Sequence, residues 1–143
     1  MSGTILLAGA SGDVGQRIAR ELLSRGATVR ALSRPGTNLD NVARLIAMGL
    51  HGVEADYTDA AELQKAMLGV DCVVTTLSGP EPVIIHAQML LLEAAVAAGV
   101  PRFMPSDYSI DYTGPVEPKP AASPRIQQAP RCCTNQGYVG SFR

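Results

Sequence analysis

The chain has no tryptophan, only 4% aromatic residues and a net charge of −1 over 143 residues. A charge so close to zero argues against the basic surface by which proteins hold nucleic acid or anionic membranes. Its three cysteines, Cys72, Cys132 and Cys133, form neither a Cys-x-x-Cys pair nor an even framework, so we expect no disulfide scaffold and no metal site. The most apolar stretch, 83–100, contains polar residues, which predicts a buried helix and not a membrane span.

The length of the chain and its N-terminal sequence also limit the kind of protein that it can be. A length of 143 residues suits a single compact domain. The N-terminus lacks the pattern of an export signal, because a glycine-rich loop interrupts its short apolar run. We therefore expect a cytoplasmic domain whose partner is a small molecule, with no nucleic acid or membrane partner.

Glycine is abundant, and three glycines follow the first apolar run in Gly9-Ala10-Ser11-Gly12-Asp13-Val14-Gly15. A diphosphate that approaches the backbone needs a tight turn, a residue without Cβ beside it, and close packing of helix on strand. The anion would lie on the free N–H groups at the helix N-terminus. The pattern indicates a nucleotide-phosphate loop; the alternative is a plain connection between a strand and a helix.

Apolar runs and helical periodicity alternate along the first two thirds of the chain, with short glycine-marked connections. We expect helices that begin near Val14, after caps at Asn38 and Thr58, and at Val83. The five expected strands are 5–8, 28–32, 52–55, 71–77 and 102–104. This alternation predicts an α/β fold, a doubly wound parallel sheet of the Rossmann type in a single domain.

Ligands of such sheets bind beyond the carboxyl ends of the strands. After the second expected strand, where a carboxylate would bind the ribose 2′-hydroxyl of NAD, the chain has Ser33 and Arg34. A guanidinium can pair with a 2′-phosphate and stack on adenine, so the loop favours NADP(H) over NAD(H). Alternatively, Arg34 is only a solvated loop charge.

Two further loops carry candidates at the same end of the sheet. Asp56 follows the third strand and could accept a hydrogen bond from the adenine amino group, or only cap the next turn. Leu77, Ser78 and Gly79 follow the fourth strand and leave room for the nicotinamide side of a dinucleotide, although a plain turn would look the same. His86 could face this crevice, but a boundary position is the commoner role for such a histidine.

Together with the motifs above, the segment Gly99-Val100-Pro101-Arg102-Phe103-Met104-Pro105-Ser106-Asp107-Tyr108 resembles the NmrA-like, isoflavone-reductase-like branch of the atypical short-chain dehydrogenases. The family pattern ends in Glu-Phe where this chain has Asp107 and Tyr108. The resemblance implies an NADP-binding domain of a reductase that transfers hydride to a small aromatic or quinone-like substrate, or else a cofactor sensor without turnover. The cofactor-binding residues expected from loops and resemblance are Gly9, Ser11, Gly12, Asp13, Val14, Gly15, Ser33, Arg34, Asp56, Leu77, Ser78, Gly79, Pro105 and Ser106.

The sequence changes character after Gly114. Residues 1–114 hold 8 Lys and Arg against 12 Asp and Glu, whereas 115–143 hold 4 against 1, together with five of the ten prolines. We therefore expect a Rossmann-type domain over 1–114 and an irregular tail over 115–143, arising from a lost reading frame or, alternatively, serving as a proline-rich linker.

Catalytic candidates are few. The downstream lysine and the substrate lobe of the reducing relatives are not recognisable, so the only candidates are Tyr108, which could donate a proton but also suits packing, and Lys119. Apolar faces that a missing lobe would cover predict self-association into homo-oligomers.

Overall fold

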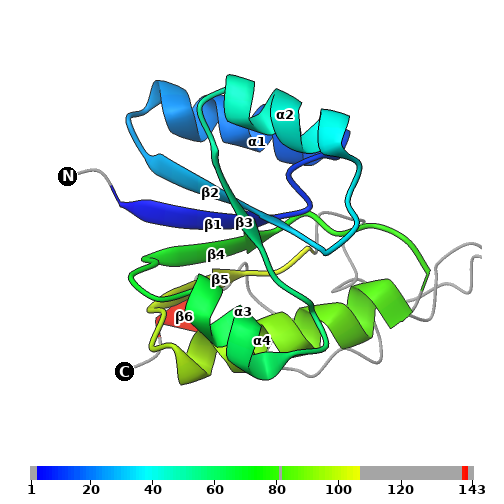
Figure 1. Cartoon of the computed structure of the whole chain (residues 1–143). Helices are drawn as coiled ribbons and strands as arrows, with labels where there is room; N and C mark the ends of the chain where they lie inside the picture. Colours follow the sequence, from blue (N-terminus) through cyan, green and yellow to red (C-terminus); the bar gives the residue numbers. More distant parts are fainter. Residues whose placement is uncertain (1–2, 81, 107–139, 142–143) are drawn as a thin grey trace, which may run out of the picture.

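The computed structural model describes residues 3–80, 82–106 and 140–141, and these form one sheet with helices on both faces (Figure 1). Five strands pair in parallel: β1 (Thr4–Ala8), β2 (Thr28–Ser33), β3 (His51–Glu54), β4 (Cys72–Thr75) and β5 (Arg102–Met104). The strand order is β3-β2-β1-β4-β5-β6. The expected doubly wound parallel α/β sheet is therefore confirmed.

The sixth strand, β6 (Gly140–Ser141), was not expected. It belongs to the predicted irregular tail, yet it pairs antiparallel with β5, so that Phe103 lies opposite Gly140. The exposed edge of β5 offers unpaired backbone groups to any segment that reaches it, which no local pattern in the tail reveals. The predicted boundary at Gly114 and residues 107–139 lie outside the described residues.

Sheet order sets the place where a ligand can enter. The chain steps outward from β1 to β2 and β3, then returns to place β4 on the other side of β1. Helices that follow β1 and β4 leave on opposite faces, which opens a crevice between the carboxyl ends of these two strands. The glycine-rich loop lies directly after β1, at this crevice.

Helices α1 (Asp13–Ser24) and α2 (Leu39–Ala47) cover one face, and α3 (Ala60–Ala66) and α4 (Gln88–Ala97) cover the other (Figure 1). Consecutive residues of β1 point to opposite faces, so Leu6 joins a core with Leu63 and Leu91, while Leu7 joins a second core with Val29. Burial of both faces explains why the strands read as continuous apolar runs.

Helix ends agree only partly with the sequence patterns. The cap of α3 is Asp59, whose carboxylate accepts hydrogen bonds from the N–H groups of Ala61 and Glu62, and not the predicted Thr58. The predicted long helix from Val83 begins instead as a π-helix, η1 (Pro82–Ala87), and continues as α4. Periodicity cannot reveal this, because one π-helical turn inserts a residue without changing the apolar character of the segment.

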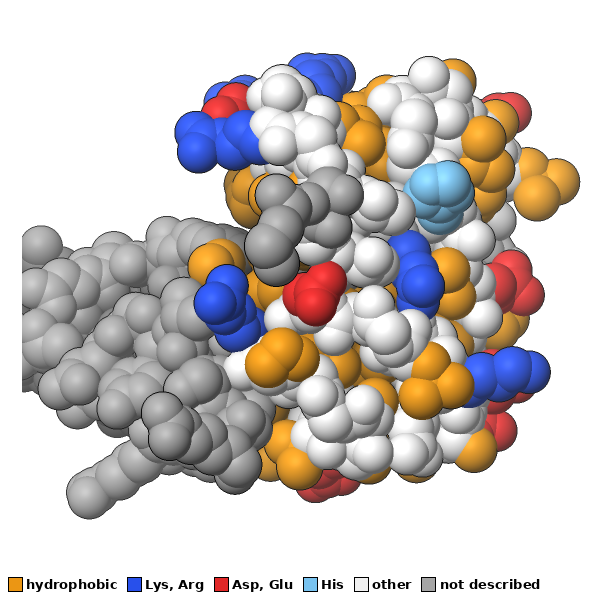
Figure 2. Space-filling view, turned by 90° about the vertical axis from the view of Figure 1, so that its left-hand side faces the viewer, with side chains coloured by type: hydrophobic (Ala, Val, Ile, Leu, Met, Phe, Trp, Pro, Cys, Tyr) orange, Lys and Arg blue, Asp and Glu red, His pale blue; other side chains and the backbone are white. Residues whose placement is uncertain are grey.

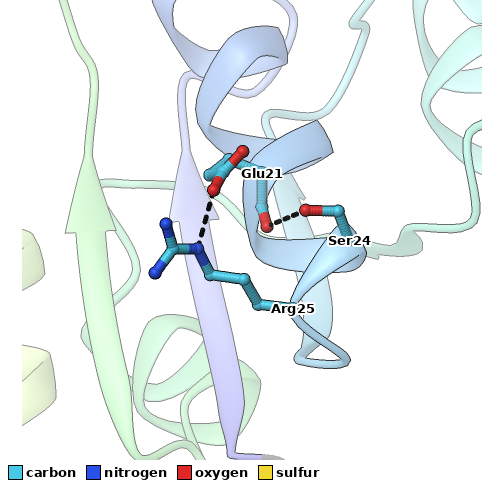
Figure 3. Close-up of polar contacts among 3 residues, drawn as sticks. All are labelled: Glu21, Ser24 and Arg25. Atoms are coloured by element: carbon cyan, nitrogen blue, oxygen red, sulfur yellow. Dashed lines mark hydrogen bonds and ion pairs between the residues drawn. The ribbon is translucent and has the colours of Figure 1, made fainter.

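Charged side chains lie mainly at the surface and pair locally. Near the end of α1, Arg25 bonds the Glu21 carboxylate at 2.7 Å, and the Ser24 hydroxyl donates to the Glu21 carbonyl oxygen at 2.8 Å (Figure 3). On the face at which the parallel strands begin, basic and acidic side chains lie in several small groups among polar and apolar ones (Figure 2). Within the described part of the chain, no helix is both long and apolar enough to cross a membrane.

Candidate functional site

A cleft of about 520 Å³ lies beyond the carboxyl ends of β1 to β4. The glycine loop after β1 lines the middle of the cleft. The loops after β2 and β3 line one end, and the loop after β4 lines the other end together with the η1–α4 segment. The predicted site residues that line it are Gly9, Ser11, Gly12, Arg34, Asp56, Leu77 and Ser78. Four separate loops therefore meet where the sheet order reverses.

Gly9, Gly12 and Gly15 differ in why the loop has a glycine at that position. Gly9 has φ +85, and a Cβ there would lie 2.7 Å from Oγ1 of Thr76. A Cβ on Gly15 would clash with the carbonyl oxygen of Gly9 and lie 2.9 Å from Cα of Ala10. At Gly12 the nearest atom to an added Cβ is the Gly9 oxygen, at 3.4 Å. Gly9 thus makes the turn, Gly15 allows helix and loop to pack, and Gly12 leaves open space in the cleft.

The N-terminus of α1 points into this space. Gly12 is its N-cap and offers no side chain to the first-turn N–H groups. These groups have no partner one turn earlier in the helix, and they carry the positive end of the helix dipole. An open glycine beside such donors fits the diphosphate of a nucleotide.

Arg34 and Tyr57 form the end of the cleft at β2 and β3. The guanidinium carbon of Arg34 lies 6.0 Å from the centre of the Tyr57 ring. Burial raises the pKa of Tyr57 to about 12, against a smaller opposing effect of the nearby guanidinium, so the phenol is neutral at pH 7. Thr37 closes the Arg34 turn by donating its N–H and hydroxyl to the Arg34 carbonyl oxygen, at 3.1 and 2.6 Å. The guanidinium is thereby carried on a closed turn above an aromatic face.

Asp56 faces the same end but is already engaged. Its Oδ1 accepts hydrogen bonds from the N–H and the hydroxyl of Thr58, at 2.8 and 2.7 Å. These bonds lower the pKa of Asp56, so the carboxylate is charged at neutral pH. The structure thus shows the turn-capping role that the sequence left as an alternative, and Thr58 serves this turn rather than the cap of α3.

The opposite end of the cleft follows β4. Thr76 donates its hydroxyl to the carbonyl oxygens of Ala8 and Gly9, at 3.0 and 2.9 Å, which joins this end to the glycine loop. Beyond it, Leu77 and Ser78 form a wall together with His86 of η1. His86 is exposed and lines the cleft, so of the two roles that the sequence left open the structure favours the one at the crevice.

Other predicted site residues do not line the cleft. Ser33 donates its hydroxyl to the Val53 carbonyl oxygen, and Ser106 donates its hydroxyl to that of Leu77. Asp13 is exposed and pairs with Arg17 on the outer side of α1, with 3.2 Å between Oδ2 and Nη2. The remaining members of this group are Val14, Gly15, Gly79 and Pro105. The catalytic candidates Tyr108 and Lys119 lie outside the described residues.

Some cleft residues were missed by the sequence interpretation as site residues. Thr37, Tyr57 and Thr58 lie in loops whose position was foreseen, whereas Thr76 and Leu90 had no signal beyond their apolar surroundings. In the part of the chain that the structure describes, no cluster of three His, Cys, Asp or Glu residues could hold a metal ion.

Comparison with known proteins agrees with this geometry. A model of the NmrA-like family matches residues 1–122. The chain belongs to the NmrA-like family. Similar proteins of this family include a bifunctional pinoresinol-lariciresinol reductase of Linum usitatissimum, 35% identical over 113 residues, and pinoresinol reductase 2 of Arabidopsis thaliana, 34% identical over 115 residues. Each comparison covers 75% of this chain and 36% of the reductase, so the chain spans little more than a third of the length of these relatives.

Solved structures of NmrA-like relatives agree as well. The structure of AtPrR2 with NADP+ and (+)pinoresinol is 31% identical, with a TM-score of 0.67 over 78% of this chain and 38% of that one. The binary complex of leucoanthocyanidin reductase with NADPH from Vitis vinifera is 31% identical, with a TM-score of 0.68 over 81% of this chain and 40% of that one. Both relatives contain the phosphorylated form of the nicotinamide cofactor.

Proposed function

We propose that this NmrA-like chain binds NADP(H) in the cleft and serves as the cofactor-binding part of a reductase that acts on a small aromatic substrate. The observation that carries the proposal is Arg34, which lines the β2–β3 end of the cleft over the Tyr57 ring, in the place where NAD-specific loops have a carboxylate. A guanidinium attracts a 2′-phosphate, whereas a carboxylate would repel it.

The proposed orientation follows from the sheet order. The diphosphate lies at Gly12 and the N-terminus of α1, in the middle of the cleft. The adenosine half then extends toward Arg34 after β2, and the nicotinamide half toward Leu77 and Ser78 after β4. When bound, NADPH supplies the hydride for reduction. The chain's own residues hold the diphosphate, recognise the 2′-phosphate and shape the wall at the nicotinamide end.

Hydride transfer to an aromatic substrate rests on the names of the relatives, which are reductases of pinoresinol, lariciresinol and leucoanthocyanidin. A sensor that binds NADP(H) without turnover uses the same cleft. Mixing the full chain with NADPH and pinoresinol and following the absorbance of NADPH separates the two, because only the reductase consumes the cofactor.

Calorimetric titration of the full chain with NADPH and NADH tests the binding proposal. We expect NADPH to bind at least about tenfold more tightly, since a charge-assisted hydrogen bond contributes roughly 1.5–3 kcal/mol. Arg34→Ala should abolish this preference, because it weakens the binding of NADPH far more than that of NADH, which has no 2′-phosphate. Arg25→Ala removes the same charge at the far end of α1 and should change neither affinity. Equal affinities of the unaltered chain for the two cofactors would contradict the proposal.

A further inference from the structure

One side-chain amide joins the carboxyl ends of two neighbouring strands. Oε1 of Gln88, the first residue of α4, accepts a hydrogen bond from the Thr75 hydroxyl at 2.8 Å and another from the Ser106 backbone N–H at 2.6 Å. Thr75 ends β4 and is fully buried, and Ser106 lies just after β5. Gln88 therefore fixes the start of a helix and the ends of two strands to a single oxygen atom.

The connection continues from Ser106 to the cleft. The Ser106 hydroxyl donates to the Leu77 carbonyl oxygen at 2.6 Å, and Leu77 lines the cleft beside Ser78. On the other side of this short segment, the hydroxyl of Thr76 bonds the carbonyl oxygens of Ala8 and Gly9. The cleft wall after β4 is thus held from β1 on one side and, through Ser106, from Gln88 on the other.

We propose that Gln88 is a positioning residue for the nicotinamide half of the cofactor, acting through Ser106 and Leu77 without lining the cleft itself. The inference rests on the proposed function, which places the nicotinamide half at this wall. Without an acceptor at position 88, the Thr75 hydroxyl can still donate to the Met104 carbonyl oxygen at 3.4 Å, whereas the Ser106 N–H loses its 2.6 Å bond to Gln88. The loop after β5 then shifts to regain a partner and carries the Leu77 backbone with it.

The consequence is a selective loss of affinity. A wall displaced by a fraction of an ångström weakens contacts at its own end of the cleft. The adenosine half lies beyond the glycine loop, at Arg34 and Tyr57. Neither of these residues takes part in the hydrogen bonds that link Gln88 to Leu77, so binding at this end should not change. A purely structural role for Gln88 would reduce the folded fraction instead and would affect both halves equally.

The test compares two ligands on the full chain. Adenosine 2′,5′-bisphosphate occupies only the adenosine half, whereas NADPH occupies both. For Gln88→Leu we expect the Kd of NADPH to rise about tenfold and that of the bisphosphate to change less than twofold. Gln64→Leu is the matched control, because the Gln64 amide joins α3 to the end of α4 by a bond to the Ala97 carbonyl oxygen, away from the cleft. It should change neither affinity.

Ser106→Ala keeps the backbone bond to Gln88 and removes only the bond to Leu77, so it tests the same connection with a smaller change. We expect Ser106→Ala to raise the Kd of NADPH and to leave that of the bisphosphate almost unchanged. The double variant should bind NADPH no more weakly than Gln88→Leu alone, since both changes interrupt the same series of hydrogen bonds. The inference would be overturned if the affinities for NADPH and for the bisphosphate fell equally, or if Gln88→Leu and Ser106→Ala both left the affinity for NADPH unchanged. If the unaltered chain binds neither ligand, the proposed function itself fails.

Discussion

Adding one methyl group to Gly12 or to Gly15 separates the folding role of the glycine loop from its binding role. The two residues lie three positions apart at the start of α1, and alanine suits a helix better than glycine at most positions. Any difference between the two variants therefore reflects what surrounds each Cβ.

Gly15→Ala should destabilise the fold. Its Cβ would clash with the Gly9 carbonyl oxygen and lie 2.9 Å from Cα of Ala10, so helix and loop must move apart. Overpacking of this kind costs about 1–3 kcal/mol, and the better helix propensity of alanine offsets at most about 1 kcal/mol. We expect the free energy of unfolding to fall by roughly 1–2 kcal/mol.

Gly12→Ala should leave the stability almost unchanged. Its backbone, at φ −74 and ψ 165, suits any residue, and the nearest atom to the new Cβ is 3.4 Å away. We expect a change in the free energy of unfolding within about 0.5 kcal/mol, because a small loss at the helix cap is offset by a stiffer unfolded chain. The methyl group would instead occupy the space proposed for the diphosphate, and the Kd of NADPH should rise at least about tenfold.

Urea unfolding followed by circular dichroism gives the stability of each variant, and calorimetry gives its affinity for NADPH. If Gly15→Ala is as stable as the unaltered chain, the argument from close packing is wrong. If Gly12→Ala folds normally and binds NADPH with unchanged affinity, the glycine loop is not the diphosphate site.

Two further predictions concern Tyr57 and the surface. Burial raises the pKa of Tyr57 to about 12, so as the pH rises this phenol ionises in the unfolded chain before it ionises in the folded one. The neutral phenol therefore contributes fully to the free energy of unfolding below pH 10, and this contribution is lost as the pH rises toward 12. At pH 11 this effect lowers the free energy of unfolding by about 1.4 kcal/mol. Between pH 8 and pH 11, urea unfolding should therefore show a loss of stability that is about 1.4 kcal/mol smaller for Tyr57→Phe than for the unaltered chain. Equal losses in the two proteins would refute the raised pKa of Tyr57. Exposed apolar side chains, among them Leu39 at 82% and Ile46 at 55%, favour the predicted self-association, and a sedimentation experiment that finds only monomer would contradict it.

Much of the fold could be predicted because its signals are local. Apolar runs bounded by glycines located all five parallel strands, although β4 ends at Thr75 and not at residue 77. The spacing of Gly9, Gly12 and Gly15 likewise indicated a turn followed at once by a helix. The π-helix before α4 and the pairing of β6 with β5 could not be predicted, because a π-helical turn leaves the apolar pattern unchanged and an edge pairing depends on distant chain.

The amino-acid sequence by itself determined the strand and helix order, the glycine loop and the basic residue after β2, since each depends on neighbours within a few positions. Only the tertiary structure decided which side chains share the cleft. It placed Tyr57 beneath Arg34, brought His86 to the wall of the cleft and joined Gln88 to Ser106. The physical reason is that a hydrogen bond between residues far apart in the chain requires packed helices to bring donor and acceptor within reach, and no local pattern records that distance.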